Sequence, residues 1–323
     1  MDDCNSDHPF EIKEEVKNKS KYMIAKQLIE PKSIVVVGGS DDIHKPGGTV
    51  LRNLQDGNFK GSLYVVNPKM DEVQGIKAYR DVKDLPEVDC AILAIAAKFC
   101  PSTVEVLAKQ KNTKAFIILS AGFHEENEEG AKLERQIVET INSVGGSLIG
   151  PNCIGVLTNH YSGVFTSPIP ELNPQGVDLI SGSGATALFI MDSGMQKGIK
   201  FNSMYSVGNS AQLGVEEILE YMDESFDPKT SSRVKLLYVE SIEKPEKLLK
   251  HASSLIRKGC RIAAVKSGGS AAGSRAADGG CCPDRSATPY IGGIPWPAAG
   301  FPGPAGRCGR TPGQRGTSRT AAE

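Results

Sequence analysis

The sequence lacks several features that would place it in other classes of protein. No stretch approaches the roughly 20 apolar residues that a membrane helix needs. Neither sign of charge is in excess, because 37 basic residues stand against 38 acidic ones and the net charge is −1. The polar N-terminus, Met1–Cys4, has no hydrophobic signal segment. We therefore expect a cytoplasmic protein with no membrane or nucleic-acid partner.

Cysteine pairing is also lacking. The chain has eight cysteines, but five of them are scattered at spacings that match no metal-ligand pattern. We interpret these five as reduced thiols of a cytoplasmic protein, and we predict no metal site. They are Cys4, Cys90, Cys100, Cys153 and Cys260.

The nicotinamide fingerprint Gly-x-Gly-x-x-Gly is missing where it would be expected, yet a related arrangement is present. Residues 33–37 form an uncharged, mostly β-branched run, typical of a strand buried on both faces of a parallel sheet. Gly38 and Gly39 then permit a sharp turn, and a helical pattern starts at Gly47. Free N–H groups and the helix dipole favour an anion there. By itself the turn fits either a nucleotide-like ligand or an empty strand–helix connection.

Strand and helix patterns alternate along most of the chain, and 323 residues give room for about two domains. This alternation predicts an α/β fold with doubly wound parallel sheets. The first group follows a leading helical segment over residues 8–30, and the second follows a loop near residues 166–174. The predicted strands are 33–37, 63–66, 89–95, 115–119 and 147–149, then 177–180, 204–207, 234–239 and 261–265.

The last 46 residues, from Asp278, differ in composition from the rest. They contain no lysine or histidine, but they hold 10 of the 35 glycines, 7 of the 19 prolines and the single tryptophan. No apolar periodicity runs through them, so we expect a disordered tail. It is either a natural Pro/Gly-rich tail or the translation of GC-rich DNA in the wrong frame.

Four polar turns follow predicted strands, and the carboxyl ends of parallel strands are where ligands bind in such sheets. Each turn alone is consistent with a structural connection, but together they predict a ligand site. They contain Asn152 and Cys153, then Ser181, Ser183 and Gly184, then Gly208 and Asn209, and finally Glu240.

These motifs, taken in order, resemble the N-terminal half of the nucleoside-diphosphate-forming acyl-CoA synthetases, the family of ADP-forming acetate–CoA ligase. Succinyl-CoA synthetase α subunits are more distantly similar. The resemblance implies a CoA-binding Rossmann-like domain over residues 31–165 and a flavodoxin-like ligase domain over 166–277. An extension (1–30) and the tail (278–323) flank them. The motifs are VVGGS (36–40), KPG (45–47), VNPK (66–69), SAGF (120–123), GPNCIG (150–155), SGSGA (181–185), SVGN (206–209), YVE (238–240) and VKSG (265–268).

The resemblance also implies a role for each motif. CoA phosphates would lie at the first glycine turn and near two lysines, although those lysines also fit a solvated surface. The pantetheine would follow the SAGF turn, and a phosphate would lie at the later turns. Glu240 would orient a catalytic histidine. The implied CoA-binding residues are Gly38, Gly39, Ser40, Lys45, Lys69, Ser120, Ala121 and Gly122; Asn152 and Cys153 would flank the reacting centre, and Ser181, Ser183, Gly184, Gly208 and Asn209 would hold phosphate.

One departure from the family is serious. The family has Ser-His-Thr-Gly-Ala where this chain has Asp278–Cys282, and no histidine follows His251. We interpret His44, His124 and His160 as surface histidines. The chain is therefore expected to bind CoA but to be inactive alone, truncated before its phosphohistidine. ADP, ATP and Mg²⁺ would bind only to an ATP-grasp domain or β subunit; a homo-oligomer is the other assembly considered. A regulatory CoA-binding module and an NAD-dependent oxidoreductase remain alternatives.

Overall fold

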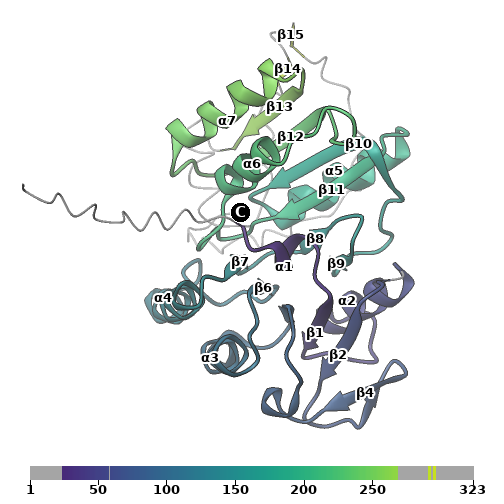
Figure 1. Cartoon of the computed structure of the whole chain (residues 1–323), viewed down its shortest axis with the longest axis vertical. Coiled ribbons are helices and arrows are strands. Elements are labelled where there is room, and N and C mark those ends of the chain that lie inside the picture. Colours follow the sequence, from purple (N-terminus) through teal and green to yellow (C-terminus); the bar gives the residue numbers. More distant parts are fainter. Residues whose placement is uncertain (1–23, 58, 268–289, 292–293, 296–323) are drawn as a thin grey trace, which may run out of the picture.

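The computed structural model describes residues 24–57, 59–267, 290–291 and 294–295, which form two mainly parallel sheets flanked by helices (Figure 1). The predicted α/β class with two sheets is confirmed. The predicted leading helix and the tail from residue 278 lie largely outside the described residues. The parts of these two segments that are described contain helix α1 (Lys26–Ile29) and strands β14 (Tyr290–Ile291) and β15 (Ile294–Pro295). No described helix is long and apolar enough to cross a membrane.

The first sheet has β1 (Ser33–Val37) near its middle, in the order β3-β4-β2-β1-β5-β6-β7. β1 pairs in parallel with β2 and β5, as the apolar run predicts for a strand buried on both faces. β3 runs antiparallel to β4. The other strands are β2 (Ser62–Val66), β3 (Glu72–Val73), β4 (Ile76–Tyr79), β5 (Cys90–Leu93), β6 (Ala115–Ile118) and β7 (Ser147–Ile149).

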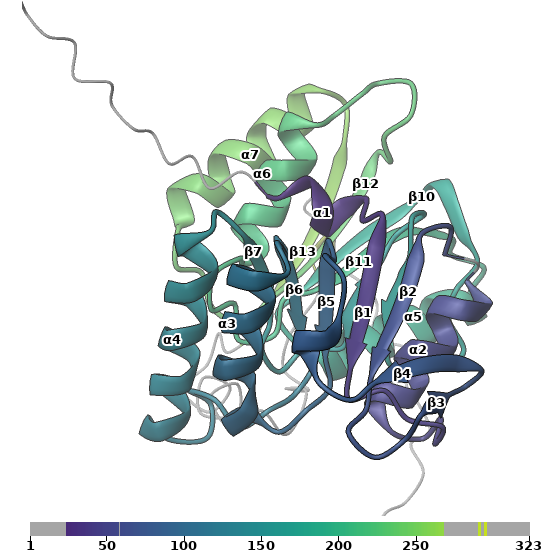
Figure 2. The ribbon, with the colours of Figure 1, turned by 60° about the horizontal axis from the view of Figure 1, so that its bottom comes forward.

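Alternate residues of β1 face two different layers. Val35 and Val37 pack in one apolar cluster with α3 (Cys100–Gln110) and α4 (Glu128–Ser143), which lie side by side along one flank of the sheet (Figure 2). Ile34 and Val36 pack in a second cluster with α2 (Pro46–Asp56). Because strand side chains alternate, an unbroken apolar strand serves both layers.

The second sheet has the order β15-β14-β13-β12-β10-β11-β8-β9. Its central strands β11, β10, β12 and β13 are parallel, and β8 joins β11 in the antiparallel sense. The strands are β8 (Gly155–Leu157), β9 (Ser162–Val164), β10 (Leu172–Ser181), β11 (Phe201–Ser206), β12 (Val234–Val239) and β13 (Arg261–Lys266).

Three helices cover this sheet. α5 (Gly184–Gln196) buries Ala187 and Met191 against Leu179 of β10, in a cluster of its own. α6 (Val215–Glu224) and α7 (Pro245–Arg257) contribute instead to the cluster that contains Ile34 and Val36.

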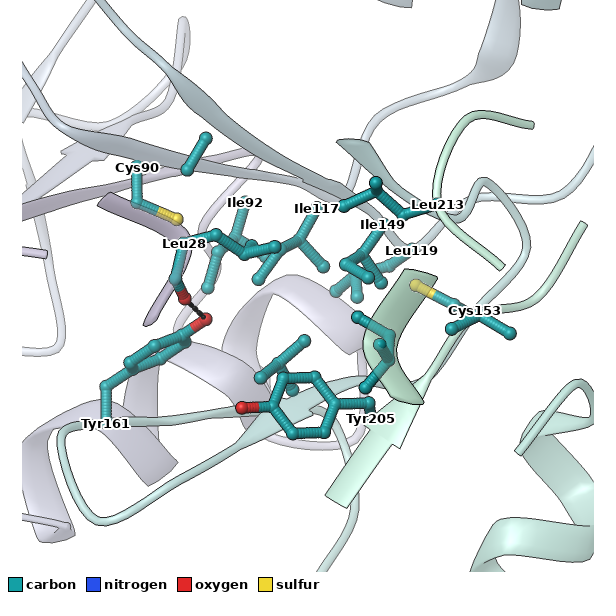
Figure 3. Packing of buried hydrophobic residues seen from close by; sticks show 14 of the residues in the cluster. Leu28, Cys90, Ile92, Ile117, Leu119, Ile149, Cys153, Tyr161, Tyr205 and Leu213 are labelled. Carbon is teal, nitrogen blue, oxygen red and sulfur yellow. Dashed lines mark hydrogen bonds between the residues drawn. The ribbon is translucent and has the colours of Figure 1, made fainter. Parts of the chain in front are cut away.

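That second cluster is therefore shared by both sheets. It contains Ile34 and Val36 of the first sheet and Ile180 of the second. Figure 3 shows Ile92 and Ile117 of the first sheet in the same cluster as Tyr205 of the second. In the same region the buried hydroxyl of Tyr161 donates to the carbonyl oxygen of Leu28 at 2.7 Å. The two sheets consequently share one hydrophobic core rather than meeting through a polar interface.

The structure differs from the sequence prediction near the junction between the sheets. Residues 155–164 fall within the predicted first domain, yet their strands β8 and β9 belong to the second sheet, with Val156 opposite Tyr205. β10 begins at Leu172, inside the predicted loop. β8 and β9 were not predicted, because strands of three residues have no recognisable period and these two do not alternate with helices, as the equally short β7 does.

Candidate functional site

The glycine turn after β1 is shaped by close backbone contacts. Gly38 has φ +87°, and a Cβ there would lie 2.5 Å from the carbonyl oxygen of Ala94. A Cβ at Gly47, in the first turn of α2, would lie 2.0 Å from the carbonyl oxygen of Gly38. Within the described part of the chain, no acceptor takes the amide hydrogens of Gly39 or Ser40. The turn therefore offers free N–H donors beside a helix N-terminus.

Two lysines lie on segments that contact this turn. Lys45 precedes α2, and its ammonium lies 3.6 Å from Asp42. Asn67 donates from its side-chain amide to the carbonyl oxygen of Gly39 at 2.8 Å, while its Oδ1 accepts from the amide of Lys69 at 2.9 Å. Asn67 thus holds the Lys69 loop against the glycine turn. The sequence analysis gave it no role, although it lies in the VNPK motif.

The SAGF turn follows β6 and already uses part of its hydrogen-bonding capacity. The Ser120 hydroxyl donates to the carbonyl oxygen of Ile95, which fastens this turn to the end of β5. The Gly122 amide donates to Oε1 of Glu125 at 2.7 Å. Ala121 is exposed. Backbone contacts to a ligand at this turn are therefore limited to its outer surface.

A cavity of about 740 Å³ lies where turns from both halves of the chain meet. The four turns that the sequence predicted to act together line it, at the carboxyl ends of β7, β10, β11 and β12. It also contains residues that the sequence analysis did not select. Its lining includes Leu119, His124, Glu125, Asn152, Cys153, Gly182, Ser183, Gly184, Gly208, Asn209, Glu216, Glu217, Glu240 and Lys244. The predicted CoA-binding residues at positions 38–69 do not line this cavity.

The start of α5 supplies the main anion-binding geometry of the cavity. Ser183 is the N-cap, and its hydroxyl accepts from the amide of Thr186 at 3.4 Å. Ser181 braces this turn, because its hydroxyl donates to the carbonyl oxygen of Ser183 and accepts from the Ser183 amide. The first N–H groups of a 13-residue helix have no intrahelical acceptor, so they point into the cavity as donors.

Glu240 projects from the end of β12 toward this turn. Burial raises the pKa of its carboxyl above the ordinary value, although a hydrogen bond with Ser183 and the charge of Lys266 oppose the shift. A carboxyl in this position can hold or release a proton closer to neutral pH than an ordinary glutamate.

Asn152 and Cys153 line the cavity in different ways. The Cys153 side chain is 2% exposed, and its thiol donates to the carbonyl oxygen of Ile118. Burial raises the pKa of this thiol to about 12, so a thiolate nucleophile is not formed at neutral pH. Asn152 is exposed, and its side-chain amide donates to Oδ1 of Asn209 at 3.4 Å. The contribution of Cys153 to the site is therefore through its backbone.

A polar cluster joins the two halves at the cavity wall. Asn209 donates from its amide to Glu125 at 2.5 Å and to Glu134 at 3.1 Å. Glu134 also accepts from Nδ1 of His124. The side chain of His124 is 48% exposed, as expected for a surface histidine, but it lines the cavity, which was not predicted. One polar side-chain atom from each of His124, Glu125 and Glu134 lies within 4.8 Å of the other two.

Two protein-family models match the chain. A CoA binding domain matches residues 32–159, and a succinyl-CoA ligase like flavodoxin domain matches residues 174–280. The first contains the glycine turn after β1, and the second contains the turns at Ser181, Gly208 and Glu240.

Similar proteins agree on the family. Acetate–CoA ligase [ADP-forming] I of Archaeoglobus fulgidus is 36% identical over 256 residues, which are 78% of this chain and 36% of that protein. Acetate–CoA ligase [ADP-forming] II subunit alpha of Pyrococcus furiosus is 36% identical over 77% of this chain and 53% of its own length. The chain is similar to the N-terminal portion of the nucleoside-diphosphate-forming acyl-CoA synthetases.

Solved structures of this family have the same fold. The dinucleotide forming acetyl-coenzyme A synthetase 1 of Ca. Korarchaeum cryptofilum, in complex with phosphate and ADP, superposes with a TM-score of 0.70 at 31% identity. The match covers 80% of this chain and 55% of that one. The chain thus spans between about a third and about half of the length of the relatives cited here, and it corresponds to their N-terminal portion.

Proposed function

We propose that this chain is the CoA-binding part of an ADP-forming acyl-CoA synthetase of the acetate–CoA ligase type. The complete reaction converts acyl-CoA, ADP and phosphate to acid, CoA and ATP through an acyl phosphate and a phosphohistidine. The observation that carries the proposal is the shared cavity, in which turns at Asn152, Ser183, Asn209 and Glu240 meet although they are far apart in sequence.

CoA would bind across the first domain. Its phosphates would contact the glycine turn at Gly38, Gly39 and Ser40, where free amides lie beside Lys45 and Lys69. The pantetheine would pass over the outer surface of Ser120–Gly122 and bring the thiol to the cavity. We propose the same domain boundaries as the sequence gives, 31–165 and 166–277.

The second domain would supply the phosphate site. The proposed phosphate ligands are the N-terminal amides of α5 with Ser181, Ser183 and Gly184, and the facing turn at Gly208 and Asn209. Asn152 and the Cys153 backbone would border the reacting atoms. Glu240 would orient the phosphohistidine, as carboxylates do for imidazoles elsewhere.

That histidine is absent from this sequence, because the family motif is replaced from Asp278 onward. We therefore propose that phosphoryl transfer is lost and that this chain alone does not make ATP. ADP, ATP and Mg²⁺ would bind to an ATP-grasp domain or subunit, which fits the alpha-subunit names of two relatives. The buried free thiols of Cys90, Cys100 and Cys153 support a cytoplasmic location.

Calorimetry with CoA and with NAD, each titrated into the purified chain, tests this proposal. We expect CoA to bind and NAD to bind far more weakly, because the turn lacks the nicotinamide fingerprint. Equal binding of both ligands, or binding of neither, would reject the CoA assignment.

A further inference from the structure

We propose that His124, oriented by Glu134, is the base that takes the proton from the CoA thiol when CoA attacks an acyl phosphate. The inference rests on the proposed function, because it requires CoA to bind with its thiol in the cavity. It assigns a catalytic role to a residue that the family motifs do not include.

The hydrogen bonds of His124 determine which ring nitrogen is available. Nδ1 lies 2.8 Å from Oε1 and 2.9 Å from Oε2 of Glu134, whose side chain is 12% exposed. An ionised carboxylate only accepts hydrogen bonds, so Nδ1 must carry the hydrogen. In the neutral ring Nε2 then keeps its lone pair. No described residue donates a hydrogen bond to Nε2.

The position of His124 matches the path proposed for CoA. The residue comes directly after the SAGF turn, along which the pantetheine would run, and it lines the same cavity as Ser183 and Gly184. Of the four histidines in the described part of the chain, His124 alone lines this cavity. The thiol, the acyl phosphate and an imidazole would therefore meet in one place.

The other titratable groups of the cavity are less suited to this proton transfer. Burial favours the neutral form of Glu125 and Glu217, but hydrogen bonds hold the pKa of both carboxyls below the ordinary value. The donors are Asn209 and the Gly122 amide for Glu125, and Lys244 for Glu217. Lys244 is cationic and lies 2.8 Å from Glu217. Glu240 is the remaining competitor, and it contacts the phosphate turn through Ser183.

Two carboxylates and one amide surround the ring of His124. Glu134 faces it from α4, Glu125 belongs to its own loop, and the neutral amide of Asn209 faces both carboxylates from the β11–α6 turn. A thiol is largely protonated at neutral pH and only its thiolate is a good nucleophile, so a base in this position increases the rate. Histidine is the side chain that exchanges a proton most readily in that range.

The step balances without any further reactant. The thiol sulfur attacks the carbonyl carbon of the acyl phosphate, and its proton passes to Nε2 of His124. The S–C bond forms, and the bond between the acyl carbon and the oxygen that bridges to phosphorus breaks. Inorganic phosphate leaves with the electron pair of that bond. The proton on His124 is then released to the phosphate or to water. This half-reaction needs no phosphohistidine, so the present chain can carry it out.

The test uses the purified full chain with CoA and acetyl phosphate, and it measures acetyl-CoA above the uncatalysed background. We expect the wild type to form the thioester and His124→Gln to lose roughly 100-fold or more in kcat, the usual scale for a general base. CoA affinity, measured by calorimetry, should be unchanged. Added imidazole should partly restore a His124→Ala variant, and Glu134→Gln should show a smaller loss.

His160→Gln is the matched control, because His160 is an exposed histidine outside the cavity. If CoA does not bind, the proposed function itself fails. If CoA binds but the wild type forms no acetyl-CoA, or if His124→Gln retains the wild-type rate and pH profile, the role of His124 is rejected. Loss of activity in Glu240→Gln with full activity in His124→Gln would assign the base to Glu240 instead.

Discussion

Lys69 places a positive charge beside the glycine turn, and no carboxylate pairs with it in the described part of the chain. We expect Lys69→Ala to weaken CoA binding by roughly 1–2 kcal/mol, the scale of a charge-assisted hydrogen bond. Calorimetry measures the change. Lys83→Ala, at an exposed lysine on the η1 turn (Val82–Asp84), is the control and should bind CoA as the wild type does. Equal losses in both variants would indicate a general effect of charge rather than a contact.

Glu240 gives a prediction about pH and stability. Its carboxyl has a raised pKa in the folded chain, chiefly because it is partly buried, so its ionised form destabilises the fold. This cost is absent at low pH, where the group is protonated in both states, and appears as the pH rises above the ordinary glutamate value. Thermal unfolding of Glu240→Gln should therefore show a higher Tm than the wild type at pH 7 and no difference near pH 4. A gain of the same size at both pH values would contradict this assignment.

At the scale of single residues, the sequence predicted which residues line the cavity better than it predicted which contacts they make. The turns at Ser183, Asn209 and Glu240 were selected from composition and strand position, and the structure places all three in one cavity. Asn67 and Glu134 were not selected, because their importance comes from contacts with segments distant in sequence. Cys153 was selected as a cavity residue, but sequence could not show that its thiol points into the core.

The β8–β9 hairpin holds the last turn of α1 through a buried hydrogen bond. Tyr161, between its two strands, donates to the carbonyl oxygen of Leu28 while 2% exposed. Tyr161→Phe should lower the free energy of unfolding by about 1–2 kcal/mol, because it leaves that carbonyl oxygen without its donor. Denaturant titration measures the loss. Tyr79→Phe, at a half-buried tyrosine of β4, should change stability far less; equal losses would show that the Leu28 contact is unimportant.

Among the elements, most strands that alternate with helices were predicted, but the short strands β3, β4, β8 and β9 were not. β1 and β12 match their predicted ranges at both ends, because each is a mostly apolar run that ends at a sharp change in composition, to glycine after Val37 and to a carboxylate after Val239. The sequences of the three-residue strands β8 and β9 are too short to show an apolar period. The position of β8 is determined by its pairing with β11 rather than by local propensity.

For the whole molecule, the missing histidine decides which reactions are possible. We expect the purified chain to incorporate no labelled phosphate and to make no ATP from acetyl-CoA, ADP and phosphate, even with an ATP-grasp partner added. Phosphoryl relay needs a nucleophilic imidazole near neutral pH, and the family position for it is occupied by Asp278–Cys282. A chain rebuilt with Ser-His-Thr-Gly-Ala at that position, from another reading frame, should gain acid-labile phosphate. Label on the unaltered chain would refute the truncation.

The apolar cluster shared by both sheets also affects how such a protein can change by recombination. Ile34 and Val36 pack in the same cluster as Ile180 and Tyr205, so each half completes the interior of the other. A chimaera that took one half from a relative would bring together apolar surfaces whose side chains evolved in different proteins. Voids or clashes between them would lower the free energy of unfolding by several kcal/mol, on the order of a large core substitution. The two halves are therefore expected to be inherited as a pair, and new substrate preferences to arise by substitution in the loops rather than by exchange of a half.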